Sequence, residues 1–135
     1  MGRSNDAITA YRHAINVNPN DPAAHQQLGQ LYLNEGTWGK ERIISENWVD
    51  ESTKQRIRVT ETWGYGYHWM QESISYRNQI YHSFFHPGYG GQILAVCPEL
   101  KMVIIIMAGN YDSDSKKVNY DIIRRYIIPA IENAG

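Results

Sequence analysis

The chain has little cysteine, little phenylalanine and no surplus of charge of either sign. Its 135 residues include a single cysteine, so no disulfide can form within the chain and a disulfide-stapled scaffold is excluded. The 13 basic and 14 acidic side chains give a net charge of −1. Without a basic excess, the chain lacks the electrostatic drive for binding a phosphate backbone, which argues against a nucleic-acid partner.

Long apolar runs are missing as well. The longest run, from Met102 to Ala108, falls far short of the roughly 20 residues that a membrane-spanning helix needs. The first residues, 1–6, lead into an amphipathic pattern and not into an apolar signal-peptide core. We therefore expect a soluble chain with no membrane partner and no signal peptide, and the sequence leaves its compartment open.

The residues that are present suit one small globular domain. Hydrophobic residues make up 42% of the chain, which is enough for one core at this length. Ten tyrosines and four tryptophans accompany only two phenylalanines. Tyrosine and tryptophan combine an apolar ring with a polar group, and both are favoured in pockets and interfaces.

The N-terminal quarter of the chain has a helical pattern. Apolar residues recur every three or four positions from Ala7 to Ile15, which predicts a first helix. Asp21 is a helix-capping residue and Pro22 suits the first helical position, so a second helix is predicted to begin there. Gly36 fits the left-handed residue that ends such a helix.

The rest of the chain indicates an antiparallel sheet followed by a helix. Strict alternation predicts a strand from Trp63 to Met70, and a second strand is predicted at 80–85. Two further strands, at 92–96 and 101–107, are expected to form a hairpin. Residues 103–106 are apolar on both sides, which predicts a central strand covered on both faces. A final helix is expected at 118–133, with Pro129 kinking or shortening it.

These elements define an α+β fold. We expect an antiparallel sheet of three to four strands, with an N-terminal helical hairpin and a C-terminal helix packed on it. The single cysteine, Cys97, follows an apolar strand and is expected to be a small core residue. The five histidines have no carboxylate or cysteine at metal-ligand spacing, so no metal and no cofactor are expected.

The first segment resembles a tetratricopeptide repeat. In that motif, small residues and aromatics lie where paired helices touch. The matching positions are Ala7, Tyr11, Ala14 and Pro19 in one helix, and Leu28, Gly29, Tyr32 and Gly36 in the next. The resemblance implies a helical hairpin over residues 1–36. Such repeats bury their faces only by stacking, so this hairpin must pack on another part of the chain. Leu28 and Tyr32 are expected to anchor it to the sheet.

A second resemblance, over residues 28–135, is to the C-terminal part of the serine β-lactamase-like hydrolases, which include class C β-lactamases and penicillin-binding esterases. It rests on the order and spacing of several short blocks: 28–36, 42–49, 63–69, 88–92, 98–100 and 108–111, with 127–131 in the last helix. The resemblance implies that the chain is one folded unit, in which the hairpin and the hydrolase lobe share the helix at 28–36.

The hydrolase resemblance supplies no nucleophile. That family places S-x-x-K at a helix start, whereas Ser113-Asp114-Ser115-Lys116 is predicted to lie in a polar loop. We therefore assign no catalytic residue, leave open whether the chain is an enzyme, and expect no covalent acyl-enzyme. The segment in the position of the family's third motif gives the candidates for a substrate cleft, namely His86, Pro87, Gly88, Tyr89, Gly90, Gly91 and Gln92.

Two functions from different classes remain open. The chain could be a truncated or recombined hydrolase lobe, inactive by itself. The alternative is a non-catalytic protein–protein interaction module that uses the repeat-like hairpin. The alternating aromatics Trp63, Tyr65, Tyr67 and Trp69 fit either a binding wall or a cover for the sheet. Because 103–106 is predicted to be a central strand short of neighbours, we also expect self-association as a homodimer.

Overall fold

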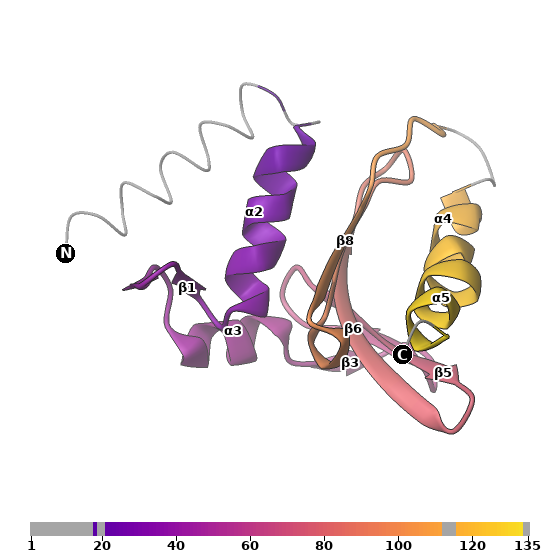
Figure 1. The fold of residues 1–135 in the computed structure, drawn as a ribbon, viewed down its shortest axis with the longest axis horizontal. Helices are drawn as coiled ribbons and strands as arrows, with labels where there is room; N and C mark the ends of the chain where they lie inside the picture. Colours follow the sequence, from indigo (N-terminus) through magenta and orange to yellow (C-terminus); the bar gives the residue numbers. More distant parts are fainter. Residues whose placement is uncertain (1–17, 19–20, 112–115, 134–135) are drawn as a thin grey trace.

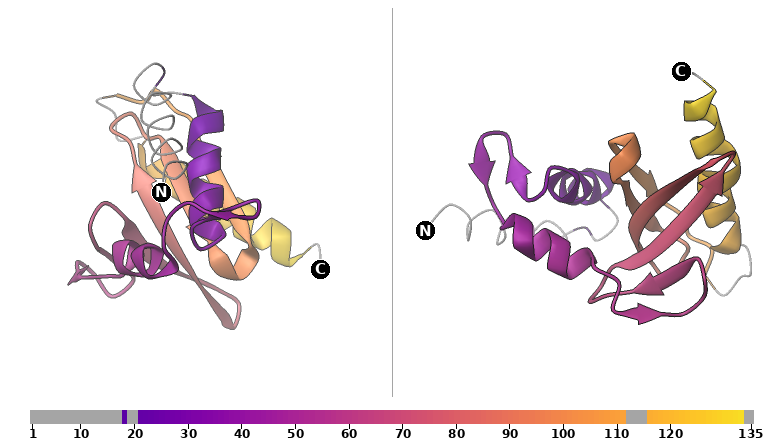
Figure 2. Two further views of the ribbon diagram at one scale, coloured as in Figure 1. Left: turned by 90° about the vertical axis from the view of Figure 1, so that its left-hand side faces the viewer. Right: turned by 90° about the horizontal axis from the view of Figure 1, so that it is seen from below.

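The chain is built in three layers around one antiparallel sheet. The computed structural model describes residues 18, 21–111 and 116–133. A six-stranded sheet forms the middle layer, helix α2 packs on one face, and the C-terminal helical segment covers the other (Figure 1, Figure 2). The α+β class is confirmed. The prediction of three to four strands is wrong, because two short strands and one polar strand extend the sheet to six.

Helix α2 (Pro22–Leu33) begins and ends as its sequence predicts. The Asp21 carboxylate accepts a hydrogen bond from the backbone N–H of Ala23 at 2.9 Å, and Pro22 occupies the first turn. Gly36 has a φ of 86°, and a side chain there would collide with the carbonyl oxygen of Ile44. The other helix of the predicted hairpin lies outside the described residues.

Helix α3 follows a short two-stranded ribbon. The ribbon pairs β1 (Thr37–Trp38) with β2 (Glu41–Arg42). Ser45 then caps α3 (Glu46–Thr53), with its hydroxyl oxygen accepting a hydrogen bond from the N–H of Trp48 at 3.1 Å. This serine is the capping residue that the sequence provides before a short apolar pattern.

The main sheet is a meander in which every strand pairs with its neighbour along the chain. The order is β3-β4-β5-β6-β7-β8, and all pairs are antiparallel. A short 3₁₀ turn, η1 (Pro98–Leu100), joins β7 to β8. The strands are β3 (Ile57–Arg58), β4 (Trp63–Tyr65), β5 (Met70–Tyr76), β6 (Gln79–Pro87), β7 (Ile93–Cys97) and β8 (Met102–Ile106).

The predicted single strand from Trp63 to Met70 is wrong. The chain turns between β4 and β5, where the N–H of Gly66 donates to the carbonyl of Trp69 at 2.9 Å. Gly66 lies so close to the backbone of Lys54 that no side chain fits there. The alternating aromatics therefore span a hairpin and not one strand. Strand β5 was not predicted because most of its residues are polar. Its Glu72 is buried in the sheet and forms an ion pair with Arg124 of the C-terminal helical segment.

The prediction that residues 103–106 form a central strand is also wrong. Strand β8 pairs with β7 and is the last strand in the sheet order. It is apolar on both sides because a helical layer covers each face. Val103 meets α2 at Gly29, whereas Ile104 joins the cluster that packs under the C-terminal helices.

The C-terminal helical segment runs without a break but changes its winding. It comprises α4 (Lys116–Ile122), a π-helical turn η2 (Ile123–Ile127) and α5 (Ile128–Glu132). Pro129 has no N–H to donate to the residue four positions earlier, and the backbone widens immediately before it. The expected disturbance at this proline thus takes the form of one π turn.

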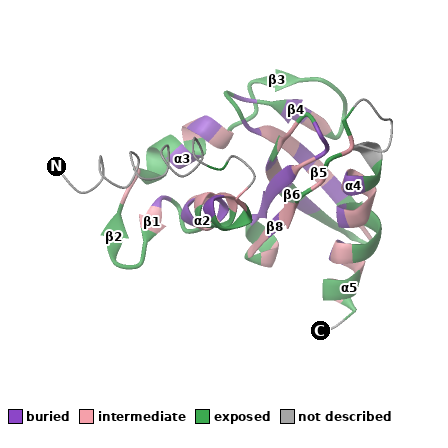
Figure 3. Ribbon diagram, turned by 90° about the horizontal axis from the view of Figure 1, so that it is seen from above, coloured by how far each residue is buried: buried purple, intermediate pink, exposed green. Residues whose placement is uncertain are grey.

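The largest buried cluster lies between the sheet and the C-terminal segment (Figure 3). Ile93, Cys97 and Ile128 are at most 2% exposed. Burial raises the pKa of the Cys97 thiol to about 11, as suits a core residue and not a reactive thiolate. Among the described residues, no helix is long and apolar enough to cross a membrane.

Candidate functional site

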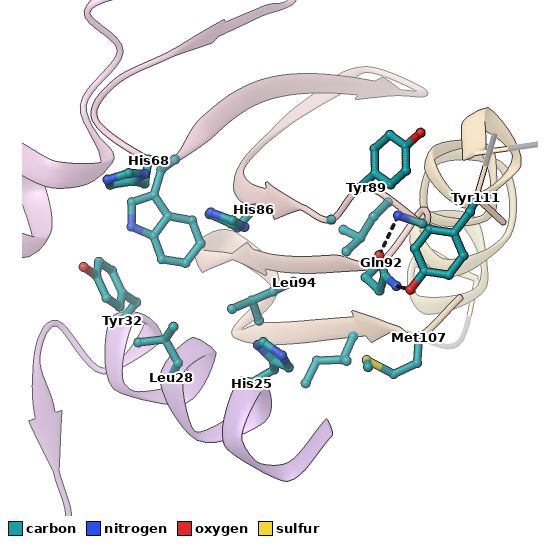
Figure 4. Close-up of a pocket in the computed structure, with 15 residues that line it drawn as sticks. His25, Leu28, Tyr32, His68, His86, Tyr89, Gln92, Leu94, Met107 and Tyr111 are labelled. Atoms are coloured by element: carbon teal, nitrogen blue, oxygen red, sulfur yellow. Dashed lines mark hydrogen bonds between the residues drawn. The ribbon is translucent and has the colours of Figure 1, made fainter. Parts of the chain in front are cut away.

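A cavity of about 560 Å³ lies between α2 and the sheet (Figure 4). Its walls come from four parts of the chain: α2, the turn before β5, the end of β6 with the glycine turn that follows, and the β7–β8 hairpin with the segment after it. The lining residues are His25, Leu28, Tyr32, His68, Trp69, His86, Gly88, Tyr89, Gly90, Gln92, Ile93, Leu94, Ile105, Met107 and Tyr111.

One face of α2 forms the helical wall. His25, Leu28, Gly29 and Tyr32 recur at spacings of three and four residues, which places them on the same side of a helix. Gly29 lies in close contact with the sheet, because a Cβ there would lie 2.5 Å from Val103 and 2.9 Å from Leu94. Leu28 and Tyr32 are only half-buried, so they line the cavity, while Gly29 makes the close contact with the sheet.

An aromatic cluster closes the cavity at the C-terminal end of α2. The rings of Tyr32 and Trp69 lie 4.7 Å apart, and the ring of Phe84 meets Trp69 edge-on at 5.1 Å. Trp69 is only 5% exposed. Rings packed at these distances and tilts form a rigid apolar wall.

Three histidines from three different elements face the same cavity. His25 comes from α2, His68 from the turn before β5, and His86 from β6 (Figure 4). The rings of His68 and His86 lie 6.5 Å apart, and Trp69 lies edge-on to His86. The side chain of His86 borders the cavity and keeps part of its surface accessible. Partial burial lowers the pKa of His86, and the nearby His68 and His25 lower it further.

The lowered pKa of His86 gives a pH-dependent stability. A histidine whose pKa is lower in the folded state favours folding above its unfolded value of about 6.5, and this contribution is lost as the pH falls below it. We therefore expect the midpoint of urea unfolding to fall as the pH drops from 7 toward 5. The H86N variant should show a shallower dependence, and an unchanged dependence in H86N would contradict the assignment.

The opposite end of the cavity is formed by the turn after β6. The side-chain oxygen of Gln92 accepts the N–H of Gly90 at 3.0 Å, and its side-chain nitrogen donates to the Tyr111 hydroxyl at 3.3 Å. The N–H of Asn110 donates to the carbonyl of Gly90 at 2.8 Å, and buried Asn119 donates to that of Gly91 at 2.6 Å. The turn is therefore held by contacts from two later segments.

The structure places most of the predicted cleft residues around this cavity. His86, Gly88, Tyr89, Gly90 and Gln92 contribute to its lining. The other two predicted residues, Pro87 and Gly91, do not line the cavity. Pro87 is the last residue of β6. Gly91 has a φ of 89°, and its carbonyl accepts a hydrogen bond from Asn119. No serine or lysine joins these residues at the cavity, and Ser113 and its neighbours 112–115 lie outside the described residues.

The alternating aromatics do not form one wall. Trp69 alone of the four lines the cavity, whereas Tyr67 is 56% exposed and stacks on Trp48 at 5.8 Å. Trp63 and Tyr65 lie on β4, near the far edge of the sheet. They separate because the chain turns between Tyr65 and Trp69.

Sequence reasoning missed His25, His68, Met107 and Tyr111 as lining residues. His25 could have been found from its helical spacing to Leu28 and Tyr32. Tyr111 could have been found from the β7–β8 hairpin, because pairing of Cys97 with Met102 carries the chain after β8 back beside the glycine turn. His68 gave no such signal, since it lies in a turn that had been predicted as strand.

The comparison with protein families finds a match at the start of the chain. Residues 1–36 match the family model of the TPR repeat. The match covers 36 of 135 residues, and residues 1–17, 19 and 20 of it lie outside the described part of the chain. No curated protein matches the sequence.

The resemblance to serine β-lactamase-like hydrolases is wrong by this comparison, since only the repeat is found. The short blocks that suggested it have local explanations. The 63–69 block is a strand and a turn, the 88–92 block is a glycine turn, and the 98–100 block is a 3₁₀ turn. Such features recur in unrelated antiparallel sheets, so their order along the chain carried too little information.

Proposed function

We propose that the chain is a non-catalytic protein–protein interaction module, and that the cavity between α2 and the sheet receives an apolar side chain of the partner. The observation that carries this proposal is the composition of the cavity. Most of its described lining is aromatic or aliphatic, with three histidines and Gln92 as further polar members, and it holds no serine, threonine, cysteine, aspartate or glutamate. Such a lining can bind an apolar group, and it lacks the serine, threonine or cysteine that a neighbouring histidine would activate for nucleophilic catalysis.

The repeat at the start of the chain supports the same class of function. TPR repeats commonly mediate protein–protein interaction, and residues 1–36 match their family model. In our proposal the segment 1–36 and the sheet act together, because α2 belongs to the repeat and also forms one wall of the cavity. The partner is then a protein segment that presents an aromatic or long aliphatic side chain.

A peptide selection tests this function. The full chain is used to select from a library of random 12-residue peptides, and the affinity of resynthesised peptides is measured by fluorescence polarisation. L28W, which fills the cavity from α2, should weaken binding at least tenfold. The matched control W48A alters an exposed aromatic residue away from the cavity and should leave the affinity unchanged. Peptides that bind L28W normally but lose affinity for W48A would contradict the proposal.

The position of β8 supports a second proposal, self-association as a homodimer. Strand β8 is the last strand in the sheet order, and its residues from Met102 to Ile106 are all apolar. An apolar strand at a sheet edge presents unpaired backbone groups that can pair with another strand. Antiparallel pairing of two copies about a two-fold axis would close and not propagate.

The dimer proposal predicts opposite effects of two charges at one position. If two copies pair with Ile104 at the centre, residue 107 of one copy faces residue 101 of the other. M107K then opposes Lys101 and should weaken association, whereas M107E should strengthen it. Sedimentation equilibrium at about 100 μM should give twice the monomer mass of 15.6 kDa for the unaltered chain. A single 15.6 kDa species for all three proteins would refute the dimer.

A further inference from the structure

The histidine end of the cavity is the only part of its described lining that can gain a full charge near neutral pH. The lining contains no aspartate, glutamate, lysine or arginine. The charge of the cavity is therefore set by His25, His68 and His86, which converge from three elements.

These histidines are not arranged as a metal site. No group of three histidine, cysteine, aspartate or glutamate side chains in the described part of the chain is placed to hold a metal ion. The rings of His68 and His86 are 6.5 Å apart, and both border the cavity beside the aromatic wall. Imidazolium rings donate from both nitrogens, so they suit an acceptor that carries negative charge.

Among the described residues that line the cavity with His86, none carries a compensating negative charge. The titratable side chains that face it from the packed elements are His25 and Tyr32 of α2 and His68 of the turn before β5, with Tyr89 and Tyr111 at the far end of the cavity. Desolvation and the two neighbouring histidines lower the pKa of His86. A bound anion would oppose both effects, so its binding and the protonation of His86 would strengthen each other.

We infer that the histidine end of the cavity binds a carboxylate carried by the same apolar group that fills the rest of the cavity. This inference rests on the proposed function of the cavity as an apolar binding site. A carboxylate fits better than a phosphate, because a dianion in a largely apolar cavity needs arginine, lysine or several backbone donors, and the lining offers no arginine or lysine. The ligand is then an aromatic or aliphatic acid, either free or as an acidic residue beside an apolar one in a peptide.

Two matched pairs of probes test the inference and separate the two sources. One pair is 2-naphthylacetate and its neutral amide, and the other is acetyl-Trp-Glu-amide and acetyl-Trp-Gln-amide. Binding to the full chain is measured by isothermal titration calorimetry at pH 5.5 and pH 8. In at least one pair, the acid should bind about tenfold tighter than the neutral probe at pH 5.5, with a smaller ratio at pH 8. The pair that shows the ratio identifies the source of the carboxylate.

Variants show whether the histidines cause the preference. H86Q should remove the preference for the acid while the neutral probe still binds, and H68Q, in an exposed turn, serves if H86Q fails to fold. The control H82Q alters an exposed histidine that pairs with Glu99 and does not line the cavity, and it should keep the preference. Equal binding of acid and amide at both pH values would overturn the inference but leave the cavity's function standing. Failure of all four probes to bind would overturn the proposed function itself.

Discussion

Replacing Ile128 with alanine is expected to lower the free energy of unfolding by about 2–5 kcal/mol. Ile128 is 0% exposed and belongs to the cluster that joins the C-terminal segment to the sheet. The substitution removes buried methyl and methylene groups and leaves a cavity that close-packed neighbours can fill only in part. Urea denaturation followed by circular dichroism measures the change.

The same helix provides a matched control. Ile131 lies three residues further along and is 37% exposed, so I131A makes the same chemical change with much less loss of burial. Its cost should stay near 0.5 kcal/mol. Equal losses for the two variants would mean that the C-terminal segment does not cover the sheet as described.

Replacing Gly29 with valine is expected to push α2 away from the sheet. Even a Cβ at this position lies 2.5 Å from Val103 and 2.9 Å from Leu94, both of which are held in the sheet. Overpacking of this kind costs about 1–3 kcal/mol, although valine forms helices slightly better than glycine. Because α2 is one wall of the cavity, G29V should also weaken peptide binding by at least tenfold.

The control for this variant is Q26V, which adds valine to an exposed position of the same helix. It changes helix propensity without contacting the sheet, so its unfolding midpoint and its affinity should both stay close to those of the unaltered chain. If G29V behaves like Q26V in both measurements, the close contact between α2 and the β7–β8 hairpin is not what holds the helix in place.

Local signals in the sequence were sufficient for the ends of α2, but not for the turn at Gly66, which lay inside a predicted strand. Asp21 and Gly36 act as predicted because capping and left-handed residues depend on their immediate neighbours. The β7–β8 hairpin was also predicted, since two β-branched runs flank a short turn with proline.

The order of the sheet could not be predicted in the same way. An apolar run such as 103–106 indicates cover on both faces, but it does not say whether strands or helices flank it. Strand β5 has few apolar residues, and its buried Glu72 becomes acceptable only through Arg124, 52 residues later. Pairing of this kind depends on tertiary contacts that local patterns do not contain.

The candidates from His86 to Gln92 were taken from the hydrolase resemblance, which the family comparison contradicts. Five of them lie around the cavity, but no pattern in the sequence itself had predicted a cavity there. The helical wall and Tyr111 come from segments far away in the sequence, and their approach depends on Gly29 and on the register of β7 with β8. An isolated histidine such as His68 carries no sign of its partners until the fold brings them together.

Intermolecular NOEs between 2-naphthylacetamide and the methyl groups of the chain test the central claim most directly. The neutral probe reports on the apolar cavity and does not depend on the charge of the histidines. We predict NOEs from the naphthyl protons to the methyl groups of Leu28, Leu94 and Ile105, which line the cavity from α2, β7 and β8. NOEs confined to other methyl groups, such as those of exposed Ile57 and Val59, would contradict a binding site between α2 and the sheet.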